Sequence, residues 1–216
     1  MLYEDNHLIA VNKPSGVLVQ GDASGALSMM DMIKEYIRKK HRKPGNVFLG
    51  LVHRLDRPVS GVVLFARTSK AASRISEQFR SRTVEKTYWA LVHGTPSQAL
   101  GGVTSYLKIG ENKVTLAKEG EKAAKEAVLS YSTLWRVKGK TLLEIRLHTG
   151  RKHQIRAQLS AIGHPIEGDV KYGAPWHLEQ GSIRLAAKSL TFRHPTRRER
   201  ITIEAPAPEW AATGKP

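Results

Sequence analysis

The sequence predicts an α+β domain, in which many strands are interrupted by a few helices. Short apolar runs with the patterns of strands recur along the chain of 216 residues. Helical spacing is confined to a few segments that do not alternate regularly with the strands, which argues against a doubly wound fold. Hydrophobic residues make up 40% of the chain, enough for a buried core, and no repeat or linker divides it. We therefore expect residues 1–216 to form one domain.

The N-terminal part predicts a strand, a turn and a helix. Apolar residues 8–11 are followed by turn residues up to Gly16. Ser28 and Asp31 have the spacing of a capping box at the start of a helix. The basic run 39–43 ends this helix and has two interpretations, a solvated helix end that complements the helix dipole or a contact to phosphate. We favour the phosphate contact.

The rest of the chain predicts mostly strands. Two buried strands are expected at 47–52 and 61–66, with residues 53–60 as the connection between them. Thr68 or Ser69 can cap the helix that follows. The run Thr149-Gly150-Arg151-Lys152 signals the start of a further helix, and Gly163 signals its end. The other strand candidates lie at 86–93, 102–109, 113–117, 125–135, 141–148, 183–192 and 200–204.

Composition indicates a polyanionic partner. Lysine and arginine number 35 against 19 acidic residues, a formal charge of +16. Such a field attracts nucleic acid, and no basic amphipathic helix with an aromatic face supports a membrane surface instead. Cysteine is absent, which excludes disulfides, thiolate nucleophiles and cysteine-bound zinc. No long apolar stretch or signal-peptide pattern is present, so we expect a cytoplasmic protein without membrane attachment.

Several motifs that carry cofactor chemistry are absent. The chain has no GxGxxG opening a helix, no GxxxxGK[ST] and no HExxH, which argues against nucleotide-dependent chemistry and a zinc hydrolase. Its histidines are scattered and never recur at the i, i+4 spacing of a helical metal site. We expect no metal site.

One acid stands out. The stretch LVHRLDRPVSG places Asp56 between Arg54 and Arg57, in the connection between two predicted strands. If either arginine approaches, it lowers the pKa of the Asp56 carboxyl and keeps it anionic, so that it can act as a nucleophile or base but not as a proton donor. The alternative is an aspartate that caps the turn and pairs with an arginine.

The motifs around Asp56 occur in an ordered series. They are LIAVNKPSG at 8–16, HRLD at 53–56, KTYWA at 86–90, TGRKHQIR at 149–156, GHPI at 163–166 and GDVKYG at 168–173. Together they closely resemble the RluA-type family of RNA pseudouridine synthases, over about residues 2–204. The resemblance implies a large mixed, mainly antiparallel sheet with flanking helices. It also implies a single catalytic domain over residues 1–216, without a separate N-terminal RNA-binding module.

The resemblance implies a reaction and a set of site residues. The family isomerises selected uridines in structured RNA to pseudouridine without metal or cofactor. It assigns the essential aspartate to Asp56, the base-stacking tyrosine and proposed C5 base to Tyr88, and the arginine that pairs with the catalytic carboxylate to Arg156. The residues expected to bind substrate are Arg54, Arg151 and His53. We expect a ribosomal or transfer RNA as the partner, no obligate protein partner and a monomer.

The chemistry suits a single carboxylate. Detaching a base from C1′ leaves an electron-poor sugar, which one carboxylate can stabilise, trap covalently or deprotonate at C2′. Hydrolysis of a glycoside generally needs two carboxyl groups and a water. Two alternatives are a non-catalytic RNA-binding protein with the same fold and a metal-dependent nuclease, which would need clustered carboxylates.

The chain departs from the family pattern in two places. Val59, after Pro58, stands where the family commonly has threonine before Ser-Gly, which removes a hydroxyl from this loop. Gln158 stands where a histidine is usual, a change that we expect to alter RNA contacts more than catalysis. Asp169 and Gln154 are kept outside the catalytic set, and Trp89 is expected in the core.

Overall fold

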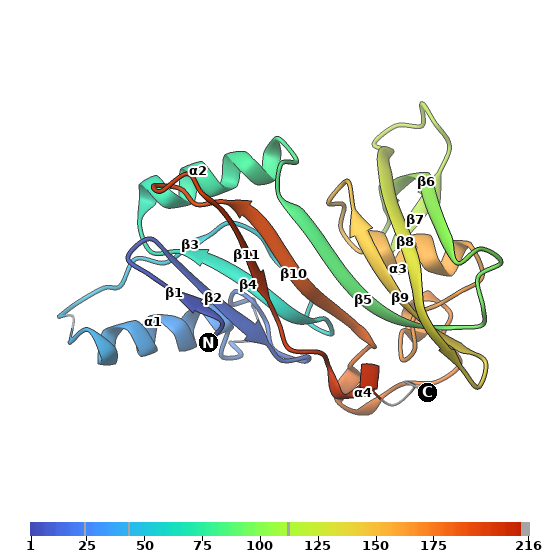
Figure 1. The fold of residues 1–216 in the computed structure, drawn as a ribbon, viewed down its shortest axis with the longest axis horizontal. Coiled ribbons are helices and arrows are strands. Elements are labelled where there is room, and N and C mark those ends of the chain that lie inside the picture. Colours follow the sequence, from blue (N-terminus) through green and yellow to red (C-terminus); the bar gives the residue numbers. More distant parts are fainter. Residues whose placement is uncertain (24, 43, 112, 213–216) are drawn as a thin grey trace. The chain divides into compact units, whose positions relative to one another are not determined.

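The computed structural model describes residues 1–23, 25–42, 44–111 and 113–212 (Figure 1). Its contacts divide the chain into two compact units. Unit 1 comprises Met1–Val84 and Ser189–Ala205, and unit 2 comprises Glu85–Lys188 with the C-terminal segment from Pro206. That residues 1–216 act as one catalytic domain stays a prediction.

Unit 1 is built on antiparallel strand pairs. β2 pairs with β1 on one side and β4 on the other, β3 pairs with β4, and β10 pairs with β11. β10 crosses the division, since only its residues from Ser189 belong to unit 1. The strands are β1 (Tyr3–Glu4), β2 (Leu8–Lys13), β3 (Gly50–Leu51), β4 (Ser60–Ala66), β10 (Leu185–Arg193) and β11 (Arg200–Glu204). The predicted strand at 47–52 is reduced to two residues.

Both helices of unit 1 begin at their predicted caps. α1 (Met29–Lys40) starts with a capping box, because the Ser28 side chain accepts from the Asp31 N–H at 3.3 Å and the Asp31 carboxylate accepts from the Ser28 N–H at 3.0 Å. α2 (Ser69–Arg80) starts at Thr68, whose hydroxyl accepts from the Ala71 N–H at 3.2 Å. Local hydrogen bonding therefore sets both helix starts.

One core cluster of unit 1 lies between α2 and one face of its strands. Alternate residues of a strand share a face, and each fully buried aliphatic side chain contributes about 1.5–3 kcal/mol. The strand residues in this cluster include Leu8, Ala10, Val62, Leu64 and Ala66, which pack with Ala71 and Ile75 of α2. This packing holds α2 over the sheet (Figure 1).

The basic run at the end of α1 is largely paired within the molecule. Arg38 and Lys39 pair with Glu35, and Lys40 and His41 pair with Glu4. Burial raises the pKa of Glu4, but hydrogen bonds from Lys40, Tyr36 and His41 outweigh it and hold that pKa at about 2. The structure thus favours a solvated helix end over the phosphate contact that we preferred from the sequence. Residue 43 of this run lies outside the described residues.

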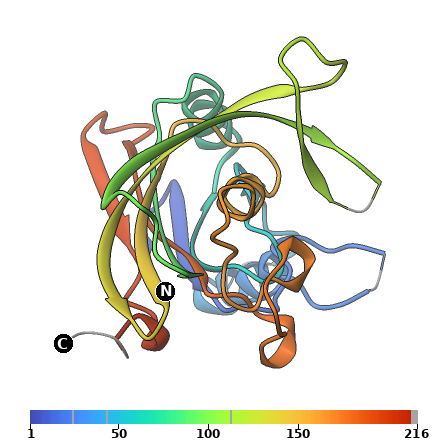
Figure 2. The same ribbon diagram turned by 90° about the vertical axis from the view of Figure 1, so that its right-hand side faces the viewer.

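Unit 2 contains a strongly curved antiparallel sheet. Its strand order is β5-β9-β8-β6-β7, and all four neighbouring pairs are antiparallel. The strands are β5 (Glu85–His93), β6 (Leu100–Ile109), β7 (Val114–Ala117), β8 (Lys125–Val137) and β9 (Lys140–Leu147). Figure 2 shows these strands curving around α3 (Gln154–Ala161). All five were predicted to within a few residues.

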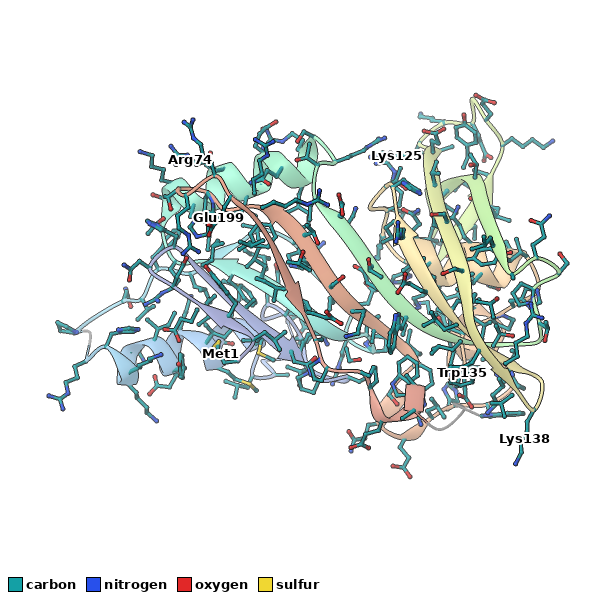
Figure 3. The ribbon with its side chains drawn as sticks, viewed as in Figure 1. Met1, Arg74, Lys125, Trp135, Lys138 and Glu199 are labelled. Carbon is teal, nitrogen blue, oxygen red and sulfur yellow. The ribbon has the colours of Figure 1, made fainter. Side chains whose placement is uncertain are left out.

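The back of the unit 2 sheet is covered by tryptophans and the C-terminal helix. Trp89, Trp135 and Trp210 pack around a small buried cluster that includes Leu91. The Trp135 indole, labelled in Figure 3, donates to the Ala211 carbonyl of α4 (Glu209–Ala212) at 3.1 Å. Trp89 therefore packs against a buried cluster, in line with the prediction.

The predicted α+β class with a mainly antiparallel sheet and flanking helices is confirmed by these elements. Two short 3₁₀ turns, Val170–Tyr172 and Glu179–Gly181, complete the structure. Over the ranges that the structure describes, no helix is long and apolar enough to cross a membrane.

Candidate functional site

Asp56 lies in the loop between β3 and β4, where the sequence predicts it. The Val59 N–H donates to the Asp56 carbonyl at 3.1 Å and closes a tight turn. Leu55 and Val59 are buried and anchor the loop, whereas Asp56 is half-buried and Arg54 is exposed. The sequence pattern therefore turns the apolar residues inward and keeps the charged ones at the surface.

A second turn holds the Asp56 loop through its main chain. The Ser15 hydroxyl donates to the Pro58 carbonyl at 2.7 Å, and the Gly16 N–H donates to the Arg57 carbonyl at 2.9 Å. The Arg57 side chain returns a hydrogen bond to the Gly16 carbonyl at 3.0 Å. Gly16 has a φ of 85°, the left-handed region in which glycine has no steric cost. These contacts support a loop in which Val59 replaces the usual threonine.

Lys13 is a buried cation behind this loop. Its side chain is 0% exposed, and its ammonium donates to the carbonyls of Pro14, Val17 and Arg57 at 3.0, 2.8 and 3.2 Å. Burial lowers the pKa of Lys13 to about 8, and the charge of Asp56 opposes that shift. The ammonium and the Asp56 carboxylate are thus close enough to interact.

His53 is held by its own unit. Its Nε2 accepts the Leu64 N–H at 2.9 Å, and its ring stacks on Phe79 with 4.8 Å between centroids. The Nε2 atom must therefore be unprotonated, since it accepts a main-chain hydrogen bond. This geometry favours a supporting role for His53, and its expected substrate contact stays a prediction.

Tyr88 lies on β5 of unit 2, opposite Ile145 of β9. Ala90 and Val92 share its face of the strand and are 0% exposed, whereas Tyr88 is half-buried. Tyr88 thus stands at the outer end of a buried row, where an aromatic ring can have one covered and one accessible part. The opposite face carries Trp89, whose indole donates to Glu144 at 3.3 Å.

Arg156 is buried on α3, and its guanidinium makes a bidentate contact with the carboxylate of Asp169. Its Nε donates to Asp169 Oδ2 at 2.7 Å and its Nη2 to Asp169 Oδ1 at 2.8 Å. The guanidinium also lies over the Tyr172 ring, 4.9 Å from the centroid. Two planar contacts fix the orientation of Arg156, which is 6% exposed.

The loop after α3 places Asp169 for this contact. Gly168 has a φ of 86°, and a Cβ atom there would lie 2.7 Å from the Leu178 side chain and 2.8 Å from the Ser182 carbonyl oxygen. The Asp169 N–H donates to the Ile166 carbonyl, and the Asp169 carbonyl accepts the Tyr172 N–H. Sequence reasoning kept Asp169 outside the catalytic set and missed it as a partner of Arg156, although the GDVKYG motif contains both Asp169 and Tyr172.

The segment before α3 is a loop rather than the start of the helix. His153 has a φ of 50° and ends this loop in the left-handed conformation. Gln154 accepts from the Thr149 hydroxyl at 2.7 Å and the Arg151 N–H at 3.0 Å, which ties the loop to the first turn of α3. The Arg151 Nε donates to the Glu126 carbonyl at 2.8 Å, so this arginine leans on β8.

Gln158 is buried inside unit 2, and the effect on RNA contacts that we expect from this change stays a prediction. Its side chain is 0% exposed, and its amide nitrogen lies 3.1 Å from the Val103 carbonyl and 3.0 Å from the Ala127 carbonyl. The residue therefore links α3 to strands β6 and β8. A polar side chain on a helix face looks solvent-facing in sequence, but here that face packs against the sheet.

The structure distributes the expected residues between the two units. Asp56, Arg54 and His53 belong to unit 1, whereas Tyr88, Arg151 and Arg156 belong to unit 2. Within unit 1 the turn at 13–16 supports Asp56, and within unit 2 Asp169 and Tyr172 support Arg156. Among the residues whose positions are described, no three histidine, aspartate or glutamate side chains gather in a way that could hold a metal ion.

Comparison with known sequences identifies the family. The model of the family described as RNA pseudouridylate synthase matches residues 7–161. The tRNA pseudouridine synthase C of Haemophilus ducreyi is 37% identical, with 95% of this chain and 89% of that protein covered. The ribosomal large subunit pseudouridine synthase D of Xylella fastidiosa is 35% identical, with 97% of this chain and 66% of that protein covered.

Solved structures agree with this assignment. The human protein titled RNA Pseudouridylate Synthase Domain Containing 4 has a TM-score of 0.81 and 27% identity, and covers 98% of this chain and 89% of its own. The human Domain Containing 1 protein, at 24% identity and a TM-score of 0.72, shares the fold. The chain therefore belongs to the RNA pseudouridylate synthase family, in the RluA-type branch that its motifs resemble.

Proposed function

We propose that this protein isomerises specific uridines in ribosomal or transfer RNA, with Asp56 acting at the ribose of a nucleotide extruded from the RNA. Membership of the family makes the protein an RNA pseudouridine synthase. The observation that carries the assignment to Asp56 is its place in the HRLD loop, half-buried between the exposed Arg54 and Arg57 and supported through the main chain. Relatives named for transfer RNA and for ribosomal RNA both match, so the proposal includes both substrates.

The reaction needs no external atom. The C1′–N1 bond breaks, the uracil turns, and a C1′–C5 bond forms; C5 loses a proton and N1 gains one. The carboxylate of Asp56 stabilises C1′, bonds to it or removes a C2′ proton while the base is detached. Because both fragments are kept, water that would hydrolyse the intermediate must be excluded. We therefore propose catalysis without metal or cofactor.

The other site residues have roles that suit their surroundings. Tyr88, partly covered and partly accessible, can stack on the extruded uracil and accept its C5 proton. Arg156, oriented by Asp169, supplies a fixed positive charge for the catalytic carboxylate. Arg54 is exposed and suits a phosphate contact, with Arg151 as a second substrate contact. We infer further that the protein acts as a monomer in the cytoplasm, without an obligate protein partner.

The experiment that tests the proposal measures tritium released from RNA transcripts labelled at uridine C5. Wild-type protein releases tritium from an unmodified transfer RNA or large-subunit ribosomal RNA transcript. Asp56→Asn abolishes release while RNA affinity stays within about tenfold, because only the charged oxygen is lost. Asp31→Asn, the same change at the exposed cap of α1, serves as a matched control and keeps wild-type release.

The two alternatives give different results. A non-catalytic RNA-binding protein would bind the transcripts and release no tritium. A metal-dependent nuclease would shorten the RNA and stop when the metal is chelated. Wild-type release by Asp56→Asn would remove Asp56 from the mechanism.

A further inference from the structure

Unit 1 carries a group of exposed cations on segments other than the Asp56 loop. It is formed by α2 and by the turn that joins β10 to β11, with the sequence His-Pro-Thr-Arg-Arg-Glu at 194–199. Figure 3 labels Arg74 of α2 and Glu199 of the turn at the same end of unit 1. We define the arginine surface by its exposed cations Lys70, Arg74, Arg193 and Arg198.

Hydrogen bonds join the two parts of this surface. The Gln78 amide donates to the Arg193 carbonyl and accepts the Arg193 N–H, both at 2.8 Å. The Arg74 guanidinium donates to the Pro195 carbonyl at 2.6 Å. Elements more than 100 residues apart in sequence are therefore held as one surface.

The turn is also ordered from within. His194 is 2% exposed; its Nδ1 accepts the Arg197 N–H at 3.1 Å, and its Nε2 lies 2.7 Å from Asp5 Oδ2. Arg198 has a φ of 63°, a conformation uncommon for residues other than glycine and asparagine. The cost of that conformation is met by the surrounding turn, so the Arg198 backbone is fixed before any ligand binds.

The charges of the arginine surface differ from those at the end of α1. Arg74 donates to a main-chain carbonyl, which is uncharged and leaves the charge of the guanidinium in place. Within the described parts of the chain, no carboxylate lies in ion-pair distance of the four cations that define the surface. Arg197, next to Arg198, is instead neutralised by Glu199 at 2.9 Å and Asp5 at 3.5 Å.

We propose that the arginine surface binds backbone phosphates of the RNA, outside the nucleotide that reacts. The inference rests on the proposed function for its choice of RNA as the partner. A guanidinium group can bind two oxygens of one phosphate, and a contact to phosphate reads no base sequence, which suits a site that holds RNA of any sequence. An anionic membrane is disfavoured, because the large apolar side chains that are exposed in the structure lie outside α2 and this turn.

The test compares two double variants that remove the same charge. Arg193→Gln with Arg198→Gln changes the arginine surface, and Arg38→Gln with Lys39→Gln changes the paired end of α1. Binding of a fluorescein-labelled, unmodified transfer RNA transcript is measured by anisotropy between about 50 and about 200 mM KCl. In the first variant, log affinity should fall less steeply with log salt, with the slope smaller in magnitude by about 1.5 units. Each lost phosphate contact removes about 0.7–0.9 units of slope. The second should leave the slope unchanged.

Further measurements separate the possible failures. Tritium release at saturating RNA should be unchanged in the first double variant, and Arg198→Lys with Arg193→Lys should restore the salt slope. Equal slopes for the two glutamine variants, in protein that melts like wild type, would overturn the arginine surface while leaving the catalytic proposal intact. Binding of the surface to anionic phospholipid vesicles in place of RNA would also overturn it. A wild-type protein that releases no tritium would refute the catalytic proposal alone.

Discussion

Asp56 and Asp169 are two aspartates in opposite surroundings. Asp169 is 1% exposed and makes two short hydrogen bonds to Arg156. Asp56 is half-buried. Its loop is held by Lys13 and Ser15, which donate hydrogen bonds to the main-chain carbonyls of Arg57 and Pro58. The comparison teaches that a buried, doubly bound carboxylate serves the fold, whereas a carboxylate presented by a supported loop can meet a substrate.

The difference should appear first in stability. Asp169→Asn leaves the Arg156 charge buried with a weaker partner, and we expect a loss of about 3–5 kcal/mol in the free energy of unfolding. Asp56→Asn should cost less than about 1 kcal/mol, because the group is half-buried. Urea unfolding of both variants measures the difference. Equal losses would erase the distinction between the two aspartates.

Lys13 tests whether the Asp56 loop is supported from behind. Lys13→Met leaves three carbonyls without their ammonium donor, and we expect a loss of about 2 kcal/mol in the free energy of unfolding at neutral pH.

The same variant has a pH signature. Burial lowers the pKa of Lys13 in the folded protein to about 8, against an ordinary lysine pKa of 10.5. Between these values the unfolded chain binds more protons, so wild-type stability relative to the variant should rise with pH from about 8 to about 10.5. A flat difference over this range would show that Lys13 is not buried as a cation.

Asp5 gives an intermediate case between Asp56 and Asp169, with 22% of its side chain exposed. Burial raises the pKa of Asp5, but hydrogen bonds from His7, Tyr3, Leu8 and His194 lower it to about 2. Its stabilising effect should be complete above about pH 3.8 and be lost as the pH falls towards 2. After allowance for solvent screening we expect about 1 kcal/mol. The melting temperature should therefore fall less steeply between pH 5 and pH 2 for Asp5→Asn than for wild type. Parallel curves would show that the hydrogen bonds to the Asp5 carboxylate do not stabilise the fold.

Ser15 should give the smallest effect. Ser15→Ala removes the hydrogen bond to the Pro58 carbonyl, while Lys13 and Gly16 still hold the loop, so we expect about 0.5–1 kcal/mol. Tritium release should fall by no more than about fivefold, because about 1 kcal/mol added to the barrier slows a reaction by about that factor. A loss of activity as large as that of Asp56→Asn would mean that Ser15 contributes to more than loop support.

Much of the fold could be predicted from local patterns. The capping box at Ser28 and the cap at Thr68 depend on residues close in sequence, and the place of the Asp56 loop follows from the apolar runs on either side of it; each was found where predicted. The site residues came from ordered motifs; the structure places Tyr88 on β5, Arg156 on α3 and the others in loops. Their roles in the reaction stay predictions.

Other features depend on residues far apart in the chain. Nothing near Gln158 in sequence indicates that its amide meets carbonyls of β6 and β8, 31 to 55 residues away. The basic end of α1 looked ready for phosphate because Glu4, which binds Lys40 and His41, lies more than 30 residues earlier. Sequence patterns report charge, but pairing depends on where the fold brings the opposite charge.

The sequence by itself determined the α+β class, the starts of α1 and α2, the position of the loop that carries Asp56 and the family, because each depends on short-range periodicity or on ordered motifs. Tertiary structure alone decided that Arg156 is clamped by Asp169 and Tyr172, that Lys13 is buried against three carbonyls, and which arginines keep their charge. The physical reason is that burial and ion pairing depend on the environment created when distant segments pack together, and that environment is not written in any one segment.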